Sequence, residues 1–323
     1  MSNWRPASGP EAAADRVALL RRVRAYFEAA GVLEVDTPTL SPAAVSDIQI
    51  ESFEIAESTV SNRPLFLHTS PEFCMKRLLA GGYPDIFSIC RVFRDGESGR
   101  KHQPEFTMLE WYRLGMGLSD IVADTVQLIK HTLGDMAPTA APVSLDYREA
   151  IHGATGLDPF TADVSALASA VDADDSLRAT IGDEKDDWLD LVLATRVFPS
   201  FAKDRLTVLQ HYPASQAALA RLCPGDAAVA DRFEVFLGPV ELANGYVELT
   251  SAHEQSARIE ADNKVRARRG RPIRKVDTDL LAALESGLPE CAGVALGLER
   301  LQMIHNKTDD IRNVITFAFE PDE

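Results

Sequence analysis

Helical and strand-like patterns of apolar residues succeed one another along the chain. Near its start, residues 11–30 place apolar side chains at near-helical spacing, followed by a glycine suited to end a helix: Val17, Leu20, Val23, Phe27 and then Gly31. Residues 31–40 begin as a short strand and turn at Pro38. The pattern therefore predicts a long helix, a strand and a proline turn, in that order.

A hairpin with a long polar loop is predicted next. Residues 64–80 have the pattern of a strand, a turn and a helix, with Ser70 or Thr69 capping the helix and Pro71 at its first position. Residues 86–93 and 106–112 have strand character, and the polar, glycine-containing segment 94–104 joins them. Residues 115–136 return to helical spacing.

The composition changes between about residues 137 and 230. Residues 158–190 hold ten acidic side chains against Arg178 and Lys185, and no motif typical of a site is found there. We interpret the region as a helical insertion and connection with a solvated acidic face, within one domain of residues 1–323. The sheet is expected to resume over 232–249, and a helix over 252–269. A helix, a strand and a helix then close the chain. Since strands and helices do not alternate regularly, an α+β fold with a mostly antiparallel sheet is favoured.

The composition is that of a cytoplasmic protein. With 46% apolar and 25% charged residues, the chain is typical of a soluble globular protein. It has no stretch of about 20 apolar residues, so no membrane partner is expected. Its first residues do not resemble a secretion signal. The cysteines are far apart and form no CxxC pair, which is typical of isolated buried thiols: Cys74, Cys90, Cys223 and Cys291.

The formal charge of −16 argues against a large nucleic-acid footprint, because phosphate binding needs a basic face. Positive charge gathers only locally, in four arginines between residues 16 and 24 and in the run 264–275 (KVRARRGRPIRK). The second run is either a solvated helix end and loop or a docking site for an acidic protein or a nucleic acid. A small nucleic-acid footprint remains compatible with this charge.

Three separated segments carry the chemistry: residues 92–112 (VFRDGESGRKHQPEFTMLEWY), 241–249 (ELANGYVEL) and 293–301 (GVALGLERL). Together they supply arginines for phosphates, an aromatic ring for a purine and carboxylates for an amine. In order and spacing they resemble motifs 2 and 3 of class II aminoacyl-tRNA synthetases of the lysyl type. The helix–glycine–strand–proline pattern before them resembles motif 1, the dimer-forming element, so the resemblance implies a homodimer. It extends from about residue 12 to the C-terminus and implies the class II catalytic fold, with helices flanking the sheet.

The resemblance implies a site for ATP and Mg²⁺. Arg94 would hold the α-phosphate and the attacking carboxylate, Phe106 would stack on adenine, and Arg300 would cover the other face of the base near the γ-phosphate. Both arginines would be catalytic through positioning and charge neutralisation. Gly293 and Gly297 would let the nucleotide approach the backbone. The full set implied for ATP is Arg94, Asp95, His102, Gln103, Glu105, Phe106, Glu241, Leu242, Gly297 and Arg300, with Glu234 and Glu241 holding Mg²⁺.

The resemblance also implies a pocket for a dicationic amino acid, with lysine or a lysine isomer as the simplest choice. Three carboxylates, from Glu72, Glu110 and Glu248, would bind its two ammonium groups, because a buried cation must be paired. Tyr112 and Asn244 would add hydrogen bonds. The full implied set is Ser70, Pro71, Glu72, Glu110, Tyr112, Asn244, Glu248 and Ala295.

Two departures separate this chain from ordinary lysyl-tRNA synthetases. Before the motif 1-like segment there is only one helix, whereas the anticodon-binding barrel needs on the order of 100 residues. Three details, TSPE at 69–72, EWYR at 110–113 and Ala295 within GVALG, resemble instead the truncated paralogues that ligate β-lysine to elongation factor P. The extra methyl group of Ala295 changes pocket depth, a difference worth roughly 1–3 kcal/mol between isomers.

The loop after Arg94 departs from those paralogues as well. Asp95, Gly96 and Glu97 stand where they have Asn-Glu-Glu, so the expected glutamate has moved by one position. Either Glu97 replaces it through a loop adjustment, or the contact is lost. Milder replacements are Gln103 for asparagine and Glu299 for aspartate; Ser251 also stands in place of an aspartate.

The implied reaction activates lysine or β-lysine as an aminoacyl adenylate with Mg·ATP and transfers it to a lysine ε-amine of elongation factor P, as an amide-forming ligase. Two alternatives stay open. One is a lysyl-type adenylating enzyme with another acceptor, tRNA or a small molecule, although the acidic charge and the missing barrel disfavour tRNA. The other is a non-catalytic sensor of a cationic amino acid. A sensor would be expected to lose phosphate and magnesium groups, whereas Arg94, Glu234, Glu241 and Arg300 are all present.

Overall fold

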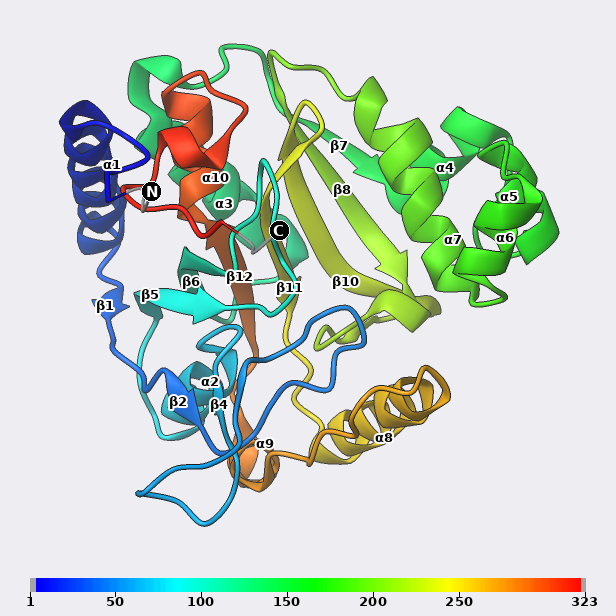
Figure 1. Ribbon diagram of the computed structural model, residues 1–323, viewed down its shortest axis with the longest axis horizontal. Coiled ribbons are helices and arrows are strands. Elements are labelled where there is room, and N and C mark those ends of the chain that lie inside the picture. Colours follow the sequence, from blue (N-terminus) through cyan, green and yellow to red (C-terminus); the bar gives the residue numbers. More distant parts are fainter. Residues whose placement is uncertain (1–3, 321–323) are drawn as a thin grey trace.

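The computed structural model describes residues 4–320 and is built around a nine-stranded mixed sheet (Figure 1). Its strand order is β1-β5-β6-β12-β11-β10-β8-β7, and β9 pairs with β10. Only the end pairs β1–β5 and β7–β8 are parallel. The nine strands are β1 (Leu33–Glu34), β5 (Ile86–Phe93), β6 (Glu105–Leu114), β7 (Val143–Asp146), β8 (Leu206–Pro213), β9 (Leu222–Cys223), β10 (Asp226–Leu237), β11 (Val240–Val247) and β12 (Cys291–Gly297). The prediction of an α+β fold with a mostly antiparallel sheet is confirmed.

Helices surround this sheet, and a second, small sheet lies beside it. The small sheet consists of β2 (Leu40–Ser41), β4 (Leu65–Leu67) and β3 (Glu54–Ile55). The helices are α1 (Pro10–Ala29), α2 (Glu72–Ala80), α3 (Leu118–Leu133), α4 (Tyr147–Thr155), α5 (Val164–Ala170), α6 (Asp175–Ile181), α7 (Lys185–Val192), α8 (Ala252–Arg268), α9 (Thr278–Gly287) and α10 (Leu298–His305). None of those within residues 4–320 is long and apolar enough to cross a membrane.

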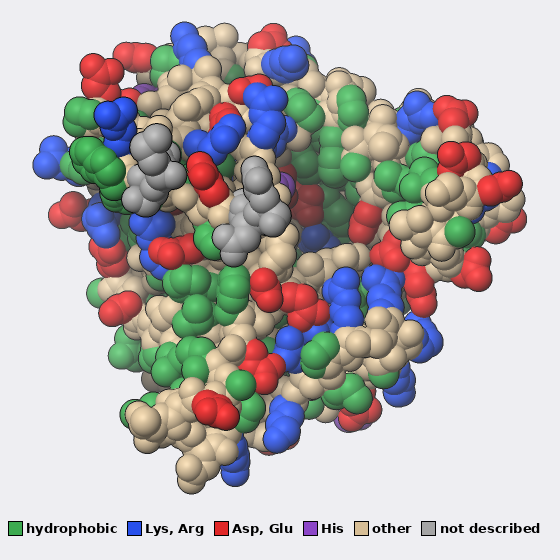
Figure 2. Space-filling model, viewed as in Figure 1, with side chains coloured by type: hydrophobic (Ala, Val, Ile, Leu, Met, Phe, Trp, Pro, Cys, Tyr) green, Lys and Arg blue, Asp and Glu red, His purple; other side chains and the backbone are tan. Residues whose placement is uncertain are grey.

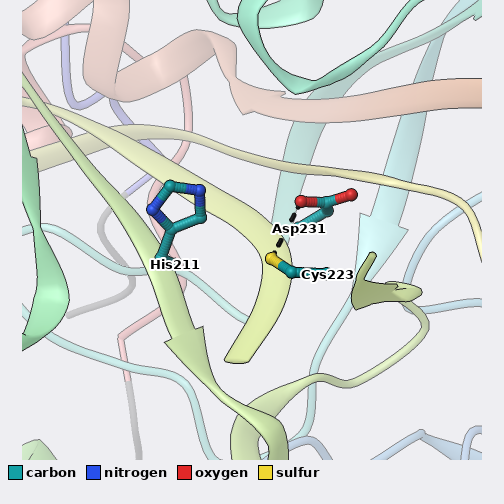
Figure 3. Close-up of side chains that lie close together, drawn as sticks. All are labelled: His211, Cys223 and Asp231. Carbon is teal, nitrogen blue, oxygen red and sulfur yellow. Dashed lines mark hydrogen bonds between the residues drawn. The ribbon is translucent and has the colours of Figure 1, made fainter. Parts of the chain in front are cut away.

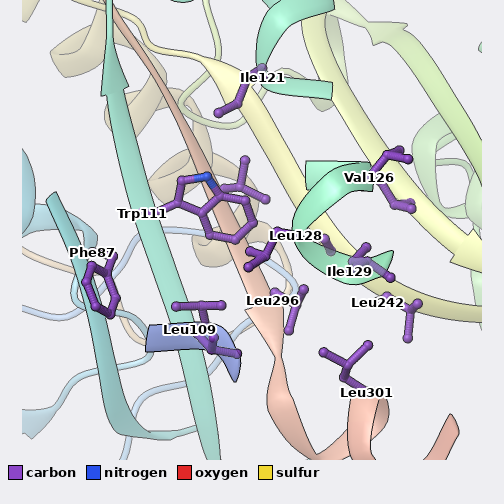
Figure 4. Packing of buried hydrophobic residues seen from close by; sticks show 14 of the residues in the cluster. Phe87, Leu109, Trp111, Ile121, Val126, Leu128, Ile129, Leu242, Leu296 and Leu301 are labelled. Carbon is purple, nitrogen blue, oxygen red and sulfur yellow. The ribbon is translucent and has the colours of Figure 1, made fainter. Parts of the chain in front are cut away.

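The main core lies between one face of the sheet and the layer of α1, α3 and α10 (Figures 1 and 4). Helix α1 buries Leu19, Val23 and Phe27, spaced four residues apart as its periodicity predicts. Phe27 stacks on Phe87 of β5 with ring centroids 4.4 Å apart. Trp111 of β6 is fully buried, and its Nε1 donates to Asp124 Oδ2 at 3.1 Å. The apolar face of each central strand therefore packs on helices, and the alternate residues remain for the opposite face.

The region 137–230 differs from the predicted helical insertion. It does contain α4 to α7, which pack around Trp188 and Tyr147, but it also contributes β7 and β8 to the main sheet. Strand β8 pairs with β10 from Leu206 opposite Leu237 to Pro213 opposite Val229, and β10 already begins at Asp226. The expectation that the sheet resumes at residue 232 was therefore wrong. The run 206–213 (LTVLQHYP) is a short, mostly apolar strand whose pattern was overlooked.

The hairpin prediction is confirmed, with one local exception. Strand β5 has the predicted bounds, and β6 begins one residue earlier and ends two residues later than expected. Helix α2, however, begins after Pro71, which is its N-cap residue, and no side chain caps it. The predicted capping by Ser70 or Thr69 was wrong, and so was the placement of Pro71 as the first helical residue.

Candidate active site

Two adjoining cavities, of about 540 and 350 Å³, open on the sheet face opposite the main core. They share Arg94, Asn244 and Ala295 in their walls, so they form one continuous cleft. Its β12 wall is made by Gly293, Ala295 and Gly297, which alternate with the core residues of that strand. Figure 2 shows the surface hollowed between the main body and the helical part formed by α4 to α7. We call the two parts the larger and the smaller cavity.

The larger cavity brings two arginines and an aromatic ring together. Arg94 directly follows β5, and its guanidinium carbon lies 5.2 Å from the centroid of the Phe106 ring. Arg300, in the first turn of α10, donates from Nη1 to a carboxylate oxygen of Glu241 at 3.1 Å and from Nη2 to His102 Nε2 at 2.5 Å. Burial and the charge of Arg300 lower the pKa of His102, which favours the neutral imidazole that can accept this bond. These groups can bind a polyanion with an aromatic base.

Most of the residues implied for ATP line the larger cavity: Arg94, His102, Gln103, Phe106, Glu241, Leu242, Gly297 and Arg300. Asp95 and Glu105 do not. The backbone of Asp95 pairs with Glu51, and Glu105 is exposed and lies 3.6 Å from the guanidinium of Arg91. Neither residue lines either of the two cavities.

The shifted glutamate of the loop does reach the cleft. Glu97 lines the larger cavity, and its carboxylate lies 3.4 Å from Arg94 Nη1. The loop turns at Gly96 with a φ of 81°, a left-handed conformation that glycine adopts without strain. Of the two outcomes left open by the sequence, the structure therefore favours the loop adjustment that places Glu97 beside Arg94.

Glu234 and Glu241 lie in the larger cavity on the adjacent strands β10 and β11. Arg232 Nη2 donates to Glu234 at 2.7 Å and Arg232 Nε donates to Asn244 Oδ1 at 3.2 Å, so this arginine orients both. Burial raises the pKa of Glu234 to about 7, although Arg232 opposes the shift. Two carboxylates facing one cavity provide the hard oxygen donors that Mg²⁺ prefers, and they fit that ion. Arg232 was overlooked, although its i, i+2 spacing from Glu234 places both side chains on one face of a strand.

The smaller cavity gathers the acidic residues implied for an amine. Glu72 comes from the first turn of α2, Glu110 from β6, and Glu248 directly follows β11. The smaller cavity is lined by seven of the eight implied residues, namely Ser70, Glu72, Glu110, Tyr112, Asn244, Glu248 and Ala295, while Pro71 lines a separate small cavity next to it. In the paired registers, Ala295 lies opposite both Asn244 and Glu110. Its methyl group therefore stands where the two cavities meet.

A buried lysine, overlooked in the sequence, sits among these carboxylates. Lys76 Nζ lies 2.7 Å from Glu72 Oε1 and 2.5 Å from a carboxylate oxygen of Glu248. Burial alone would lower the pKa of Lys76, but the two glutamates raise it above the ordinary value. Three carboxylates and one ammonium leave two negative charges when all are ionised, which matches an amino acid with two ammonium groups. The i, i+4 spacing of Glu72 and Lys76 was the available signal.

Two tyrosines complete the acidic pocket. Tyr112 donates to Glu110 Oε1 at 2.8 Å, and Tyr246 donates to Glu72 Oε1 at 2.9 Å. Glu110 Oε2 is buried without a hydrogen-bond partner, so it remains available as an acceptor. Burial and the neighbouring Glu72 raise the pKa of Glu110 well above its ordinary value. An incoming ammonium group would therefore favour the ionised form of this carboxyl group and pair with it.

The basic run 264–275 is largely part of the framework of the cleft. Arg266 is fully buried and donates to both oxygens of Glu51, at 2.7 and 2.8 Å, and to the backbone oxygen of Asp47. Arg274 also donates to Glu51, at 2.9 Å. These bonds hold the segment 47–50, which lines the larger cavity. For these two arginines, both predicted roles, a solvated helix end and a docking surface, were wrong.

Gly293 lines the smaller cavity and not the larger one. A Cβ atom at this position would lie 2.4 Å from Glu248 Oε1 and 2.5 Å from Tyr112 Cε1. The expected role in nucleotide approach was therefore wrong for Gly293, whereas Gly297 does line the larger cavity, where a Cβ atom would lie 4.0 Å from Arg300 Cδ. Glycine fits this position of β12 because the carboxylate of Glu248 and the ring of Tyr112 occupy the space that a side chain at residue 293 would need.

We expect Gly293→Ala to weaken binding of the amino acid selectively. The added methyl group must displace the ring of Tyr112 or the carboxylate of Glu248, and overpacking costs typically about 1–3 kcal/mol, which corresponds to about a 5-fold to about a 150-fold higher KM. Pyrophosphate exchange measured against amino acid and against ATP separates the two substrates. Gly153→Ala, where a Cβ atom meets no neighbour within 4 Å, is the matched control. An unchanged KM for the amino acid would contradict the role of Gly293.

The sequence that forms this fold and cleft matches a known protein family. Residues 6–321 match the model of the family described as tRNA synthetases class II (D, K and N), so the chain belongs to that family. The family membership confirms the resemblance found in motifs 1 to 3.

Within this family, several relatives that match the chain over nearly its full length share the same name. The chain is 42% identical to the elongation factor P--(R)-beta-lysine ligase of Klebsiella pneumoniae subsp. pneumoniae, over 99% of this chain and 98% of the relative. The proteins of the same name from Salmonella gallinarum and Sodalis glossinidius are 42% and 41% identical, with the same coverage. The resemblance to truncated paralogues of this kind is thereby confirmed along essentially the whole chain.

Proposed function

We propose that this protein ligates (R)-β-lysine to elongation factor P by way of an aminoacyl adenylate. This proposal rests mainly on the full-length sequence identity to ligases of that name, and the acidic pocket agrees with it. In the first step, a carboxylate oxygen of the amino acid attacks the α-phosphorus of ATP, and pyrophosphate leaves. In the second, a lysine ε-amine of the acceptor attacks the carbonyl carbon; an amide forms, AMP leaves with the carboxyl oxygen, and the amine loses a proton.

The larger cavity supports the ATP part of this proposal. Arg94 holds the α-phosphate and the attacking carboxylate, Phe106 stacks on adenine, and Arg300 covers the base from the other side. Glu234 and Glu241 would hold Mg²⁺, which neutralises phosphate charge when bound. Since the cleft positions charges and no side chain forms a covalent intermediate, catalysis rests on orientation and electrostatic stabilisation.

The smaller cavity supports a dicationic amino acid. We assign the two ammonium groups to the pocket of Glu72, Glu110 and Glu248, whose remaining negative charge after pairing with Lys76 matches them. Ala295 lies where the reacting carboxylate must pass from one cavity to the other, and its methyl group favours one lysine isomer over another. α-Lysine and β-lysine carry the same charged groups, and the two isomers differ in the position of these charges by one methylene.

We further propose a cytoplasmic homodimer with one catalytic domain over residues 1–323. Three apolar side chains in and after the motif 1-like helix are exposed, namely Val17, Leu33 and Leu40, which supports an interface on this side. Light scattering coupled to size exclusion would measure the dimer. A monomeric mass at micromolar concentration would overturn this part of the proposal.

Intact-mass analysis of elongation factor P tests the acceptor and the amino acid together. The factor is incubated with this protein, Mg·ATP and either α-lysine or (R)-β-lysine. A mass gain of one lysyl unit, larger with the β isomer, is expected. Pyrophosphate exchange without a mass gain would keep the adenylation and discard this acceptor, and parallel charging of tRNA would test that rival. Absence of exchange would favour the sensor.

Binding of the amino acid is expected to tighten as the pH rises towards about 8. Burial raises the pKa of Glu248 to about 8, although Lys76 opposes the shift. Below that pH its carboxyl is protonated in the free protein, so binding an ammonium must release a proton and the dissociation constant falls by up to about tenfold per pH unit. The titratable groups around it are Glu72 and Lys76 of α2, Glu110 and Tyr112 of β6, Tyr246 of β11 and Cys291 of β12.

Calorimetry in buffers of different ionisation enthalpy measures this proton release directly. Glu248→Gln cannot release the proton, so its residual binding is expected to lose this part of the pH dependence. A dissociation constant that stays flat between pH about 6 and 8 in the unmodified protein would contradict the assignment.

A further inference from the structure

A second cluster of ligand-type side chains lies outside the cleft, at one end of the sheet. His211 of β8, Cys223 of β9 and Asp231 of β10 each offer one ligand atom, and these atoms all lie within 4.8 Å of one another. Figure 3 shows the three side chains converging from their strands. Asp231 is buried, and the other two are half-buried. Nothing in the proposed ligase reaction uses these residues.

The backbone is arranged to bring the three together. Ala230 pairs with Tyr212 and Phe233 pairs with Gln210, so a bulge places Asp231 and Arg232 opposite His211 alone. His211 has a φ of 61°, a left-handed conformation that is uncommon for a residue other than glycine. Bulges re-aim side chains, and such strained backbone conformations gather at functional sites. The bulge and the left-handed conformation both occur at His211, whose ring faces Cys223 and Asp231.

Two of the three side chains are held by a partner outside the cluster. Nδ1 of His211 lies 2.8 Å from Asp146 Oδ2, so in the neutral imidazole this nitrogen is the donor and Nε2 offers a lone pair. Nε2 is on the side of the ring that faces the other two residues (Figure 3). Asp231 Oδ2 accepts from Arg221 Nε at 2.8 Å, and Oδ1 accepts from the Cys223 thiol at 2.9 Å. A carboxylate behind the imidazole is the usual support of a metal-binding histidine.

We propose that His211 Nε2, Cys223 Sγ and Asp231 Oδ1 form a binding site for a divalent ion of the zinc class, with the fourth position open to water. Imidazole, thiolate and carboxylate are the ligands of zinc and cobalt, whereas magnesium prefers oxygen ligands alone. Binding replaces the proton between Sγ and Oδ1, so one proton leaves for each ion bound. The thiolate and the carboxylate together balance the charge of the ion.

The ion would link three neighbouring strands beside the cleft. His211 precedes Tyr212, and Asp231 precedes Arg232; both following residues line the larger cavity, and the guanidinium carbon of Arg232 lies 4.5 Å from the centroid of the Tyr212 ring. Arg232 in turn holds Glu234 and Asn244. An occupied site therefore fixes the strand segments that carry this arginine.

Cobalt binding to the metal-free protein tests the proposal. The full chain is stripped with a chelator and titrated with Co²⁺ in the presence of excess Mg²⁺. One equivalent is expected to bind and to produce the thiolate-to-cobalt charge-transfer band, which Zn²⁺ then abolishes by displacement. Because this readout is spectroscopic, it is independent of the ligase reaction and of any failure of the proposed function.

Variants of the cluster identify the ligands. Cys223→Ser is expected to abolish the charge-transfer band, whereas Cys74→Ser, at a thiol on α2 far from the cluster in sequence and on another element, should keep it. His211→Asn removes Nε2 but tolerates the left-handed backbone, so it should fold and bind Co²⁺ at least about tenfold more weakly. No band in the unmodified chain, or an unchanged band in Cys223→Ser, overturns the proposal.

Discussion

Replacing Arg94 with alanine is expected to abolish amino-acid-dependent exchange of pyrophosphate into ATP, with a loss of at least about 10²–10³-fold in rate. The guanidinium lies in the wall common to both cavities, 5.2 Å from the Phe106 ring centroid, where a phosphate and a carboxylate must approach each other against their mutual repulsion. Without this charge, the two anions are left unneutralised at the point of bond formation. Arg94→Lys keeps the charge but loses the planar fork, so partial activity is expected.

The controls separate a lost phosphate contact from a damaged fold. Arg100→Ala removes an exposed arginine in the same loop, which pairs with Asp309 on the surface, and should keep full exchange. Calorimetry should show that Arg94→Ala still binds the amino acid, because the acidic pocket is intact. Full exchange by Arg94→Ala would refute the placement of the α-phosphate at this residue.

Replacing Lys76 with methionine is expected to destabilise the protein by about 3–5 kcal/mol near neutral pH. Methionine fills a similar volume, but it leaves Glu72, and Glu248 wherever its carboxyl is ionised, buried without a cation. The variant can relieve the repulsion only by protonating these carboxylates, so its deficit should shrink as the pH falls and grow as the pH rises. Urea denaturation at about pH 6 and about pH 8 measures the difference.

A dicationic ligand should partly rescue this variant. An ammonium group of lysine can take the place of Lys76 among the carboxylates, so millimolar lysine is expected to raise the midpoint of Lys76→Met unfolding more than that of the unmodified protein. Lys264→Met, at an exposed lysine of α8, should change stability by less than about 0.5 kcal/mol. A Lys76→Met variant as stable as the parent at both pH values would contradict a buried triad of charges.

Local sequence pattern determined the hairpin, the long first helix and the chemical inventory of the cleft. Arg94 and Phe106 could be found because a polar loop between two strands is readable over short range, and because their spacing from Glu110 and Arg300 resembles a family. Glu72, Glu110 and Glu248 were found in the same way. The sequence predicted residue types and their faces, since side chains alternate along strands.

Tertiary structure decided which of these side chains meet. Lys76 lies four residues from Glu72 but 172 residues from Glu248, and only the packing of α2 against the sheet makes it their shared cation. Arg266 lies in a basic run whose pattern also fits a solvated helix end, and only the fold brings Glu51, 215 residues away, to its guanidinium. His211 faces Asp231 only because β8 pairs with a bulged β10. Charge pairing and strand register depend on contacts between segments that are distant in the sequence. Sequence periodicity predicts which face a residue occupies within its own segment, but it does not predict which distant residue it meets.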